Sequence, residues 1–249
     1  MYPQTHVYFA EKVLGKMNDA VALGSVFPDM AIGAGVNRDI SHGSGLEMLQ
    51  YLKTHQELYD FAMANITHGV NPGGLDYYGD EKNPPSERGY CFEKGRAIVK
   101  STIKACNIPP EMGWWKAHNI IEMGIEMRIS STGNYGQYLH SAFQNTRLIE
   151  TVSKRLGDFF GQGPLPFVRR MSNFPSYIDL SNSTADSLAA KYDYQMYYKH
   201  RIRINIAEVS RLIDLAAEIV DNDMEDFFRM TIKKVKNTLA SSINRQVDY

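Results

Sequence analysis

The chain has 249 residues, of which 43% are hydrophobic and 22% are charged, and this composition is typical of a globular protein of one large domain or two small ones. Its formal net charge of -1 gives no electrostatic basis for binding nucleic acid or an anionic membrane, and no apolar run approaches the length of a membrane span. Two cysteines, Cys91 and Cys106, are too few for a disulfide framework, so we expect reduced thiols. The first residues lack the basic start and apolar stretch of a signal peptide, and we expect a cytoplasmic protein.

The first half of the chain predicts two long helices separated by irregular segments. Ala10, Val13 and Met17 recur at helical spacing and predict a helix over about residues 4–20. The glycine-rich stretch "SVFPDMAIGAGVNRDISHG" follows, and we expect a loop there. A second helix is predicted over residues 45–67, and it ends where glycines and prolines accumulate in "HGVNPGGLDYYGDEKNPPSERG".

Helical periodicity also dominates the second half, and strand signals are scarce. Helices are predicted over residues 87–106, 109–130, 135–160, 184–220 and 223–242, with an irregular link at "GQGPLPFVRRMSNFPS". We therefore predict an all-α, multi-helix bundle. Residues 1–160 would form a helical core, and residues 161–249 a C-terminal helical extension packed on the same domain.

His118 and Glu122 are the most informative pair of candidate ligands. They lie four residues apart on an apolar stripe of the predicted helix over residues 109–130, so their side chains point in the same direction. A glutamate on an apolar face is costly unless it is paired or bound to a metal. A histidine–glutamate hydrogen bond at the edge of the core explains the pair equally well.

Other residues of metal-ligand type lie at helix ends or in loops, and each has an ordinary explanation. His6 shares the inward face of the first helix and could be a buried, hydrogen-bonded histidine. His68 could cap the end of its helix, and Asp29 could be a turn or N-cap residue. His42 lies between glycines that let the backbone bend close to a ligand, and Asp76 could belong to a solvated loop.

This mixture of histidine and carboxylate ligands is typical of zinc, with manganese or iron possible. Metal clusters with open positions produce a hydroxide near neutral pH and bind phosphate oxygens, which favours hydrolysis of phosphoesters.

Five short motifs in order resemble the zinc-dependent phospholipase C / P1 nuclease family, and more closely its intracellular phospholipase C-like branch. They are "TH" at 5–6, "LGSVFPD" at 23–29, "SH" at 41–42, "THG" at 67–69 and "AHNIIE" at 117–122. The resemblance covers roughly the first 130 to 160 residues. It implies an all-α bundle that holds up to three metal ions, usually zinc, and hydrolyses phosphodiesters or phosphomonoesters with metal-activated water.

The resemblance also implies a set of ligands. The positions that match the family's ligands are His6, Asp29, His42, His68, His118 and Glu122, with Asp29 and His42 on one ion and delivered by loops. The family's bridging aspartate is replaced by Pro72, and a further histidine by Tyr78. Asp76 would supply the missing carboxylate, with Asp80 as the alternative, and the site would then hold between one and three ions.

The predicted function is hydrolysis of a small phosphoester or a phospholipid head group, with Asp29 and Asp76 as the catalytic carboxylates. The lack of an evident base-stacking motif disfavours a nucleic-acid substrate. The alternative is a non-catalytic helical protein that metal ions only stabilise. A helical phosphohydrolase of the HD type is disfavoured because no histidine directly precedes an aspartate.

Overall fold

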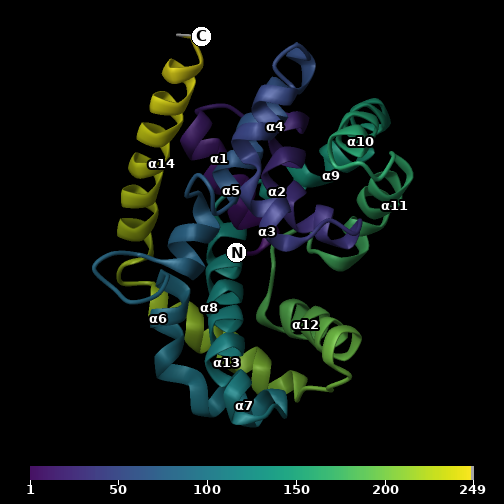
Figure 1. Cartoon of the computed structure of the whole chain (residues 1–249). Helices are drawn as coiled ribbons and strands as arrows, with labels where there is room; N and C mark the ends of the chain where they lie inside the picture. The colour runs from purple at the N-terminus through teal and green to yellow at the C-terminus, as the bar shows by residue number, and fades with distance from the viewer. Residues whose placement is uncertain (248–249) are drawn as a thin grey trace.

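The computed structural model describes the backbone of residues 1–247 and the side chains of residues 1–241. Within that part of the chain there are fourteen α-helices and no strand, so the prediction of an all-α protein is confirmed (Figure 1). The helices are α1 (Pro3–Leu14), α2 (Asp19–Gly33), α3 (Arg38–Gly43), α4 (Gly45–Tyr51), α5 (Tyr59–His68), α6 (Tyr90–Gly95), α7 (Val99–Cys106), α8 (Gly113–Ser130), α9 (Tyr135–Gln144), α10 (Thr146–Phe159), α11 (Leu165–Asn173), α12 (Ala185–His200), α13 (Ile206–Val220) and α14 (Met224–Val247).

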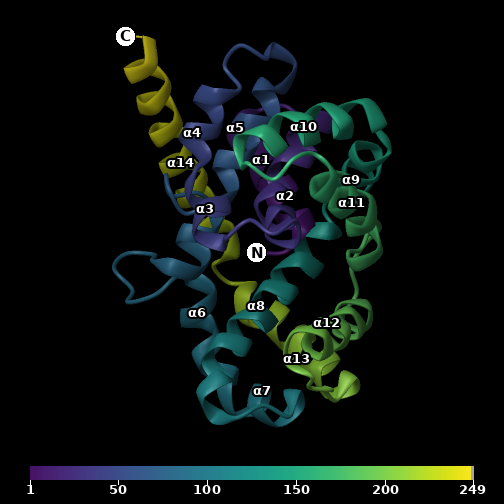
Figure 2. The same ribbon diagram turned by 45° about the vertical axis from the view of Figure 1, so that its right-hand side comes forward.

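The helices gather in two groups that α8 connects. Helices α1 to α5 lie with α9, α10 and α11 in the upper part of Figure 1, and α6, α7, α12 and α13 lie with the start of α8 in the lower part. The turned view in Figure 2 shows α9 and α11 along one flank, with α10 across the top. α2 packs on α5, α13 packs on α8, and α14 lies along α1. The ligand-type residues of α1, α2, α5 and α8 therefore meet where the two groups join.

The loop predicted around Asp29 is wrong, because residues 19–33 form the helix α2. The Asn18 side chain accepts a hydrogen bond from the backbone N–H of Val21 and so caps the helix. The helix is apolar on nearly all sides, as expected for one that is buried in the core, and this pattern conceals helical periodicity. Gly24 lies directly against the carbonyl of Phe61 in α5, so this glycine allows a close helix crossing and does not end the helix.

Several of the long predicted helices are interrupted inside their predicted ranges. The predicted helix over residues 45–67 is divided into α4 and α5 by residues 52–58. Leu52 and Leu58 would point about 120° apart on a continuous helix, and the interruption lets both enter the core. The predicted helix over residues 135–160 is divided at Asn145, whose side chain accepts the N–H of Leu148 and starts α10.

The remaining boundaries differ for similar reasons. α1 ends at Leu14 and not near residue 20, because Gly15 takes a left-handed conformation with φ of 69°. The predicted helix over residues 184–220 is divided into α12 and α13, with Arg201 in a left-handed conformation at φ of 59°. The helix predicted over residues 87–106 consists of α6 and α7 joined by one 3₁₀ turn.

The C-terminal segment packs tightly on the helix that carries His118 and Glu122. A Cβ atom at Gly124 of α8 would meet the backbone of Ala216 and Ala217, so the glycine allows α13 to cross α8 closely. The Gln4 side chain of α1 donates to the carbonyl of Ser181 at 2.7 Å. Residues 248 and 249, at the end of the predicted extension, lie outside the described residues. Among the described helices, none has both the length and the hydropathy needed to cross a membrane.

Candidate metal centre

The structure brings the predicted ligands together in three groups, of which the first two share His68. Within each group, one ligand atom per residue lies within 4.8 Å of the others. The groups are His6, His68 and Asp76; then Asp29, His42 and His68; and then Asp80, His118 and Glu122. Each predicted metal-ligand residue belongs to at least one group, and Asp80 belongs to the third.

The Asp76 carboxylate lies at the middle of the cluster. Its Oδ1 is 3.4 Å from His6 Nε2, and its Oδ2 is 3.5 Å from His42 Nε2 and 3.3 Å from His68 Nε2. Its side chain is only 5% exposed. Three imidazoles therefore face the two oxygens of one buried carboxylate, an arrangement in which a carboxylate can bridge two cations.

A helical turn delivers Asp76 and Asp80 to the cluster together. Residues Tyr77–Glu81 form a π-helical turn, in which the N–H of Lys82 donates to the Tyr77 carbonyl at 2.8 Å. Short π-helical turns are frequent at functional sites. The two aspartates lie four residues apart, so both point inward. From the sequence, Asp80 was only an alternative to Asp76. In the structure both aspartates face ligand-type residues: Asp76 lies beside the histidines of the first two groups, and Asp80 lies beside His118 and Glu122.

Hydrogen bonds orient the imidazole rings so that Nε2 points into the cluster. His68 Nδ1 lies 2.6 Å from the carbonyl oxygen of Ser25, which can only accept, so Nδ1 carries the proton and Nε2 presents its lone pair when the ring is neutral. His42 Nδ1 lies 2.8 Å from Ser41 Oγ. Metal-binding histidines are usually oriented by such a partner on the other ring nitrogen.

Several buried polar atoms of the cluster have no hydrogen-bond partner among the described side chains. They are both ring nitrogens of His6, Nε2 of His68, Oδ1 of Asp80 and Nδ1 of His118. Buried polar atoms are nearly always satisfied, so a concentration of unpartnered ring nitrogens and a carboxylate oxygen in one place needs an explanation. Divalent cations would take the lone pair of His68 Nε2, one ring nitrogen of His6 and Oδ1 of Asp80, and these residues therefore fit a metal.

The protonation states of two of the histidines, His6 and His118, point the same way. Burial and the neighbouring charge of His68 lower the pKa of His6 to about 4, and the rings of these two residues stack with centroids 3.6 Å apart. Burial also lowers the pKa of His118 to about 4. Both rings are neutral at pH 7, which is the state that binds a metal.

Carboxylates crowd the third group. Burial raises the pKa of Asp80 well above its usual range, and the like charges of Glu122 and Asp76 raise it further. The Met1 nitrogen lies 2.9 Å from Asp76 Oδ1 and 3.1 Å from Glu122 Oε1. Burial acts to raise the pKa of Asp76 and of Glu122, but the positive charge of Met1 and the neighbouring histidines outweigh it and lower both pKa values. A positive charge at this position therefore keeps these buried carboxylates ionised, as a bound cation would.

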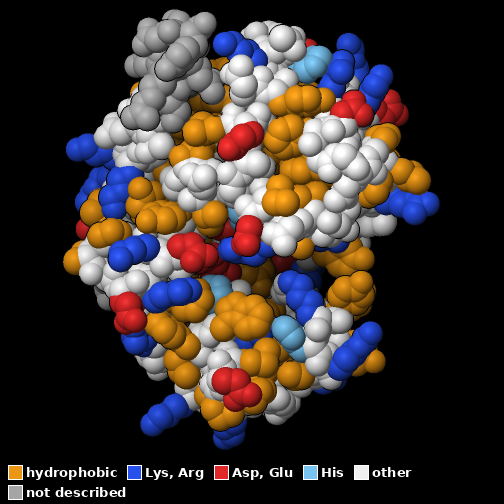
Figure 3. Space-filling view, in the orientation of Figure 1, with side chains coloured by type: hydrophobic (Ala, Val, Ile, Leu, Met, Phe, Trp, Pro, Cys, Tyr) orange, Lys and Arg blue, Asp and Glu red, His pale blue; other side chains and the backbone are white. Residues whose placement is uncertain are grey.

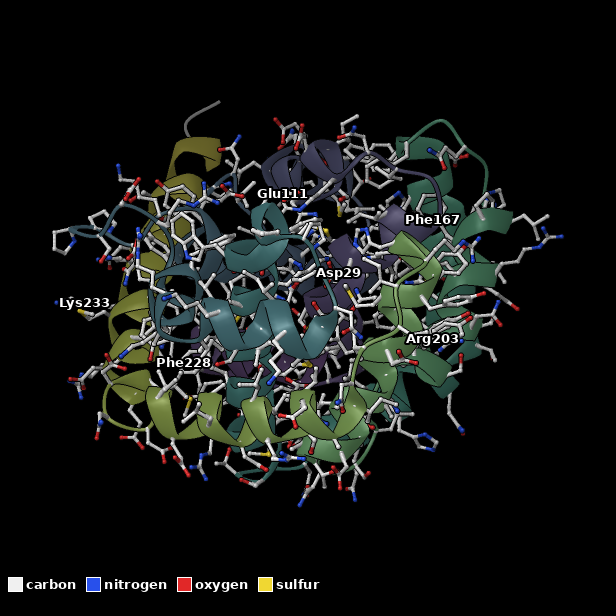
Figure 4. The ribbon with its side chains drawn as sticks, turned by 90° about the horizontal axis from the view of Figure 1, so that it is seen from below. Asp29, Glu111, Phe167, Arg203, Phe228 and Lys233 are labelled. Atoms are coloured by element: carbon white, nitrogen blue, oxygen red, sulfur yellow. The ribbon has the colours of Figure 1, made fainter. Side chains whose placement is uncertain are left out.

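The cluster is open to solvent on the side of Asp29. The Asp29 side chain is 39% exposed, whereas those of His42 and His68 are at most 1% exposed. Asp29 Oδ1 is 3.6 Å from His42 Nε2. Figure 4 looks from below and shows Asp29 near the centre of the view, with Phe167 of α11 to one side. The face drawn in Figure 3 has a hollow near its middle, bordered by acidic, basic and histidine side chains.

One sequence-based expectation about the surroundings of the site is wrong. Asp29 and His42 were expected on loops, but they lie in α2 and in the short helix α3. Glu126, one turn after Glu122 on α8, is 2% exposed and accepts hydrogen bonds from the backbone N–H groups of Gln4 and Thr5. No local signal marks this role, because the partners lie more than 100 residues away.

Comparisons of the chain with protein-family models, with curated proteins and with solved structures gave no match. The resemblance to the zinc-dependent phospholipase C / P1 nuclease family therefore stays a prediction from the motifs.

Proposed function

We propose that this protein is a metal-dependent phosphoesterase that hydrolyses a small phosphodiester or phosphomonoester, or a phospholipid head group. The observation that carries the proposal is the Asp76 carboxylate shared by three histidines, beside the exposed carboxylate of Asp29. A buried site of this kind that opens to solvent at one carboxylate can both hold cations and admit a substrate.

The side chains of this chain would divide the work as follows. Asp76 and His68 lie between the first two groups and would connect them. Asp80, His118 and Glu122 would hold a further cation. Ser25 and Ser41 would keep the rings of His68 and His42 in a fixed orientation. Asp29 lies at the open edge, where its carboxylate can orient an attacking water by hydrogen bonding.

The donor set of imidazoles and carboxylates is typical of zinc, and other divalent cations remain compatible with it. When bound, such a cation lowers the pKa of water and binds phosphate oxygens. One to three cations would correspond to the three groups of ligands.

The first prediction concerns Asp76. We expect Asp76→Asn to lower the zinc content and to reduce hydrolysis of bis(p-nitrophenyl) phosphate by roughly two orders of magnitude, because an amide cannot replace a bridging carboxylate. Zinc is measured by elemental analysis of the purified protein, and hydrolysis by release of nitrophenol. Asp39→Asn is the matched control, since Asp39 is exposed and belongs to none of the three groups.

The same measurement separates the enzyme from its alternative. Zinc bound by the unmodified protein, with no hydrolysis of any phosphomonoester or phosphodiester tested, would favour the non-catalytic helical protein that metal only stabilises. Full zinc content in Asp76→Asn would contradict the assignment of Asp76.

A further inference from the structure

The segment predicted as an irregular link after residue 160 contains α11, and this helix packs on α2. Phe167 of α11 stacks on Phe27 of α2, with ring centroids 5.9 Å apart. Phe27 precedes Asp29 by two residues. The position of α11 is therefore set relative to the open edge of the metal centre.

Arg170 lies one turn after Phe167, and its guanidinium rests against Gly33 of α2. A Cβ atom at Gly33 would collide with Nε and Cζ of Arg170, so the glycine makes room for the guanidinium. Gly33 and Asp29 are four residues apart and share one face of α2. The guanidinium consequently lies one helical turn from the carboxylate at which the cluster opens to solvent.

The charge of Arg170 has no acidic partner. Among the described side chains, no carboxylate oxygen lies within 4.0 Å of the guanidinium, and Nε is buried without a hydrogen-bond acceptor. The guanidinium carbon instead lies 5.0 Å from the ring centroid of Phe174 and 5.4 Å from that of Tyr177. The rings hold the guanidinium in place by cation–π contact but do not neutralise it.

We propose that Arg170 binds the phosphate group of the substrate at the edge of the metal centre. The inference rests on the proposed phosphoesterase function and names a substrate-binding residue for it. A planar guanidinium can donate two parallel hydrogen bonds to two oxygens of a phosphate, and a phosphate that enters beside Asp29 comes within reach of it. An anion there would also supply the acceptor and the negative charge that Arg170 lacks.

The test measures binding of inorganic phosphate to the zinc-loaded, full-length protein by calorimetry. Arg170→Gln is expected to raise the Kd by about tenfold or more, because a charge-assisted bidentate contact is lost, with zinc content and melting temperature unchanged. Gly33→Ala keeps the charge and displaces only the flexible end of Arg170, and it is expected to weaken binding as well. Arg169→Gln, at the exposed neighbouring position, removes the same charge and is the matched control.

Equal Kd values for the unmodified protein and Arg170→Gln, or no phosphate binding by the zinc-loaded protein, would overturn the inference. Equal weakening by Arg169→Gln would also overturn it, since this result would indicate a general effect of net charge. Binding of dimethyl phosphate and of phosphatidylcholine vesicles, measured on the same variants, distinguishes a soluble phosphoester from a lipid head group. Arg170→Gln must weaken the binding of at least one of these two probes. Hydrolysis of bis(p-nitrophenyl) phosphate by the unmodified protein is scored separately, so failure of the function is distinguishable from failure of the residue assignment.

Discussion

At the scale of one residue, Glu122 is a buried carboxylate whose position beside a histidine indicates metal binding. It lies on α8 with its Oε1 3.9 Å from Nε2 of His118, and its side chain is 5% exposed. The spacing of four residues predicts that both side chains point the same way, and they do. Only the structure adds Asp80 as the third member of the group, because Asp80 arrives from a distant turn.

The second prediction is that Glu122→Gln lowers metal content and stability together. The amide loses the charge that a cation needs, and metal binding is linked to folding when the unfolded chain has no site. Metal stoichiometry and melting temperature are measured with and without a chelator, and we expect the chelator to lower the melting temperature less in the variant.

Glu218→Gln, on the exposed face of α13, is the control for this change. Identical melting curves for the unmodified protein and Glu122→Gln, in both conditions, would contradict the role of Glu122. They would also weaken the phosphoesterase proposal, which uses the third group.

At the scale of the helix, Glu126 explains how α1 begins without a capping side chain of its own. Tyr2 at the N-cap position makes no side-chain cap. The carboxylate of Glu126 in α8 instead accepts the N–H of Gln4 at 2.9 Å and the N–H of Thr5 at 2.8 Å. The first N–H groups of a helix have no partner within the helix, so this contact satisfies two of them and sets the position of His6 one residue later.

The third prediction is that Glu126→Gln destabilises the fold by about 1–3 kcal/mol, because a glutamine has one acceptor oxygen where the carboxyl group offers two to these buried donors. The free energy of unfolding is measured in urea, on the metal-free protein, so that loss of the cap is separated from loss of metal. Glu150→Gln, exposed on α10, is the control. A change below a few tenths of a kcal/mol would show that water replaces the carboxylate without cost.

At the scale of the whole molecule, buried polar contacts join the C-terminal helices to the rest. Lys116 of α8 is only 4% exposed, and its Nζ lies 3.0 Å from Nε2 of His200 at the end of α12. The same Nζ lies 3.8 Å from the ring centroid of Trp115. Burial and, secondarily, the like charge of Lys199 lower the pKa of Lys116 to about 8. The Lys116 ammonium donates its hydrogen bond to the imidazole of His200, whereas a buried lysine usually has a carboxylate as its acceptor.

A fourth mutational prediction follows for the pH dependence of stability. The pKa of Lys116 is lower in the folded chain than its ordinary value of 10.5, so the unfolded chain binds more protons between about pH 8 and pH 10.5. The free energy of unfolding should therefore rise with pH in that window, relative to Lys116→Met, which lacks the group. Lys104→Met, at an exposed position of α7, controls for the loss of one positive charge. A constant difference between the unmodified protein and Lys116→Met from pH 7 to pH 10 would contradict the prediction.

The amino-acid sequence by itself determined the all-α class and most of the candidate ligands. Helical periodicity and the scarcity of strand signals are local properties, so the class is evident without tertiary contacts. The pair His118 and Glu122 was readable for the same reason, because one helical turn sets their relative direction. Ordered short motifs indicated His6, Asp29, His42 and His68, although no matched family supports the resemblance.

Only the tertiary structure decided where helices begin and end inside apolar or long periodic segments. It also decided which side chains from distant parts of the chain lie together. The periodicity of α2 is hidden because that helix is buried on nearly all sides, and the interruptions of the long helices depend on which leucines reach the core. Asp80, Glu126 and Arg170 each lie against residues that are far away in the chain, as Arg170 lies against Gly33, and these distant neighbours have no trace in the local sequence. Burial decides their chemistry, since a charge removed from water must find a partner, and only the folded chain shows which partner is present and which is missing.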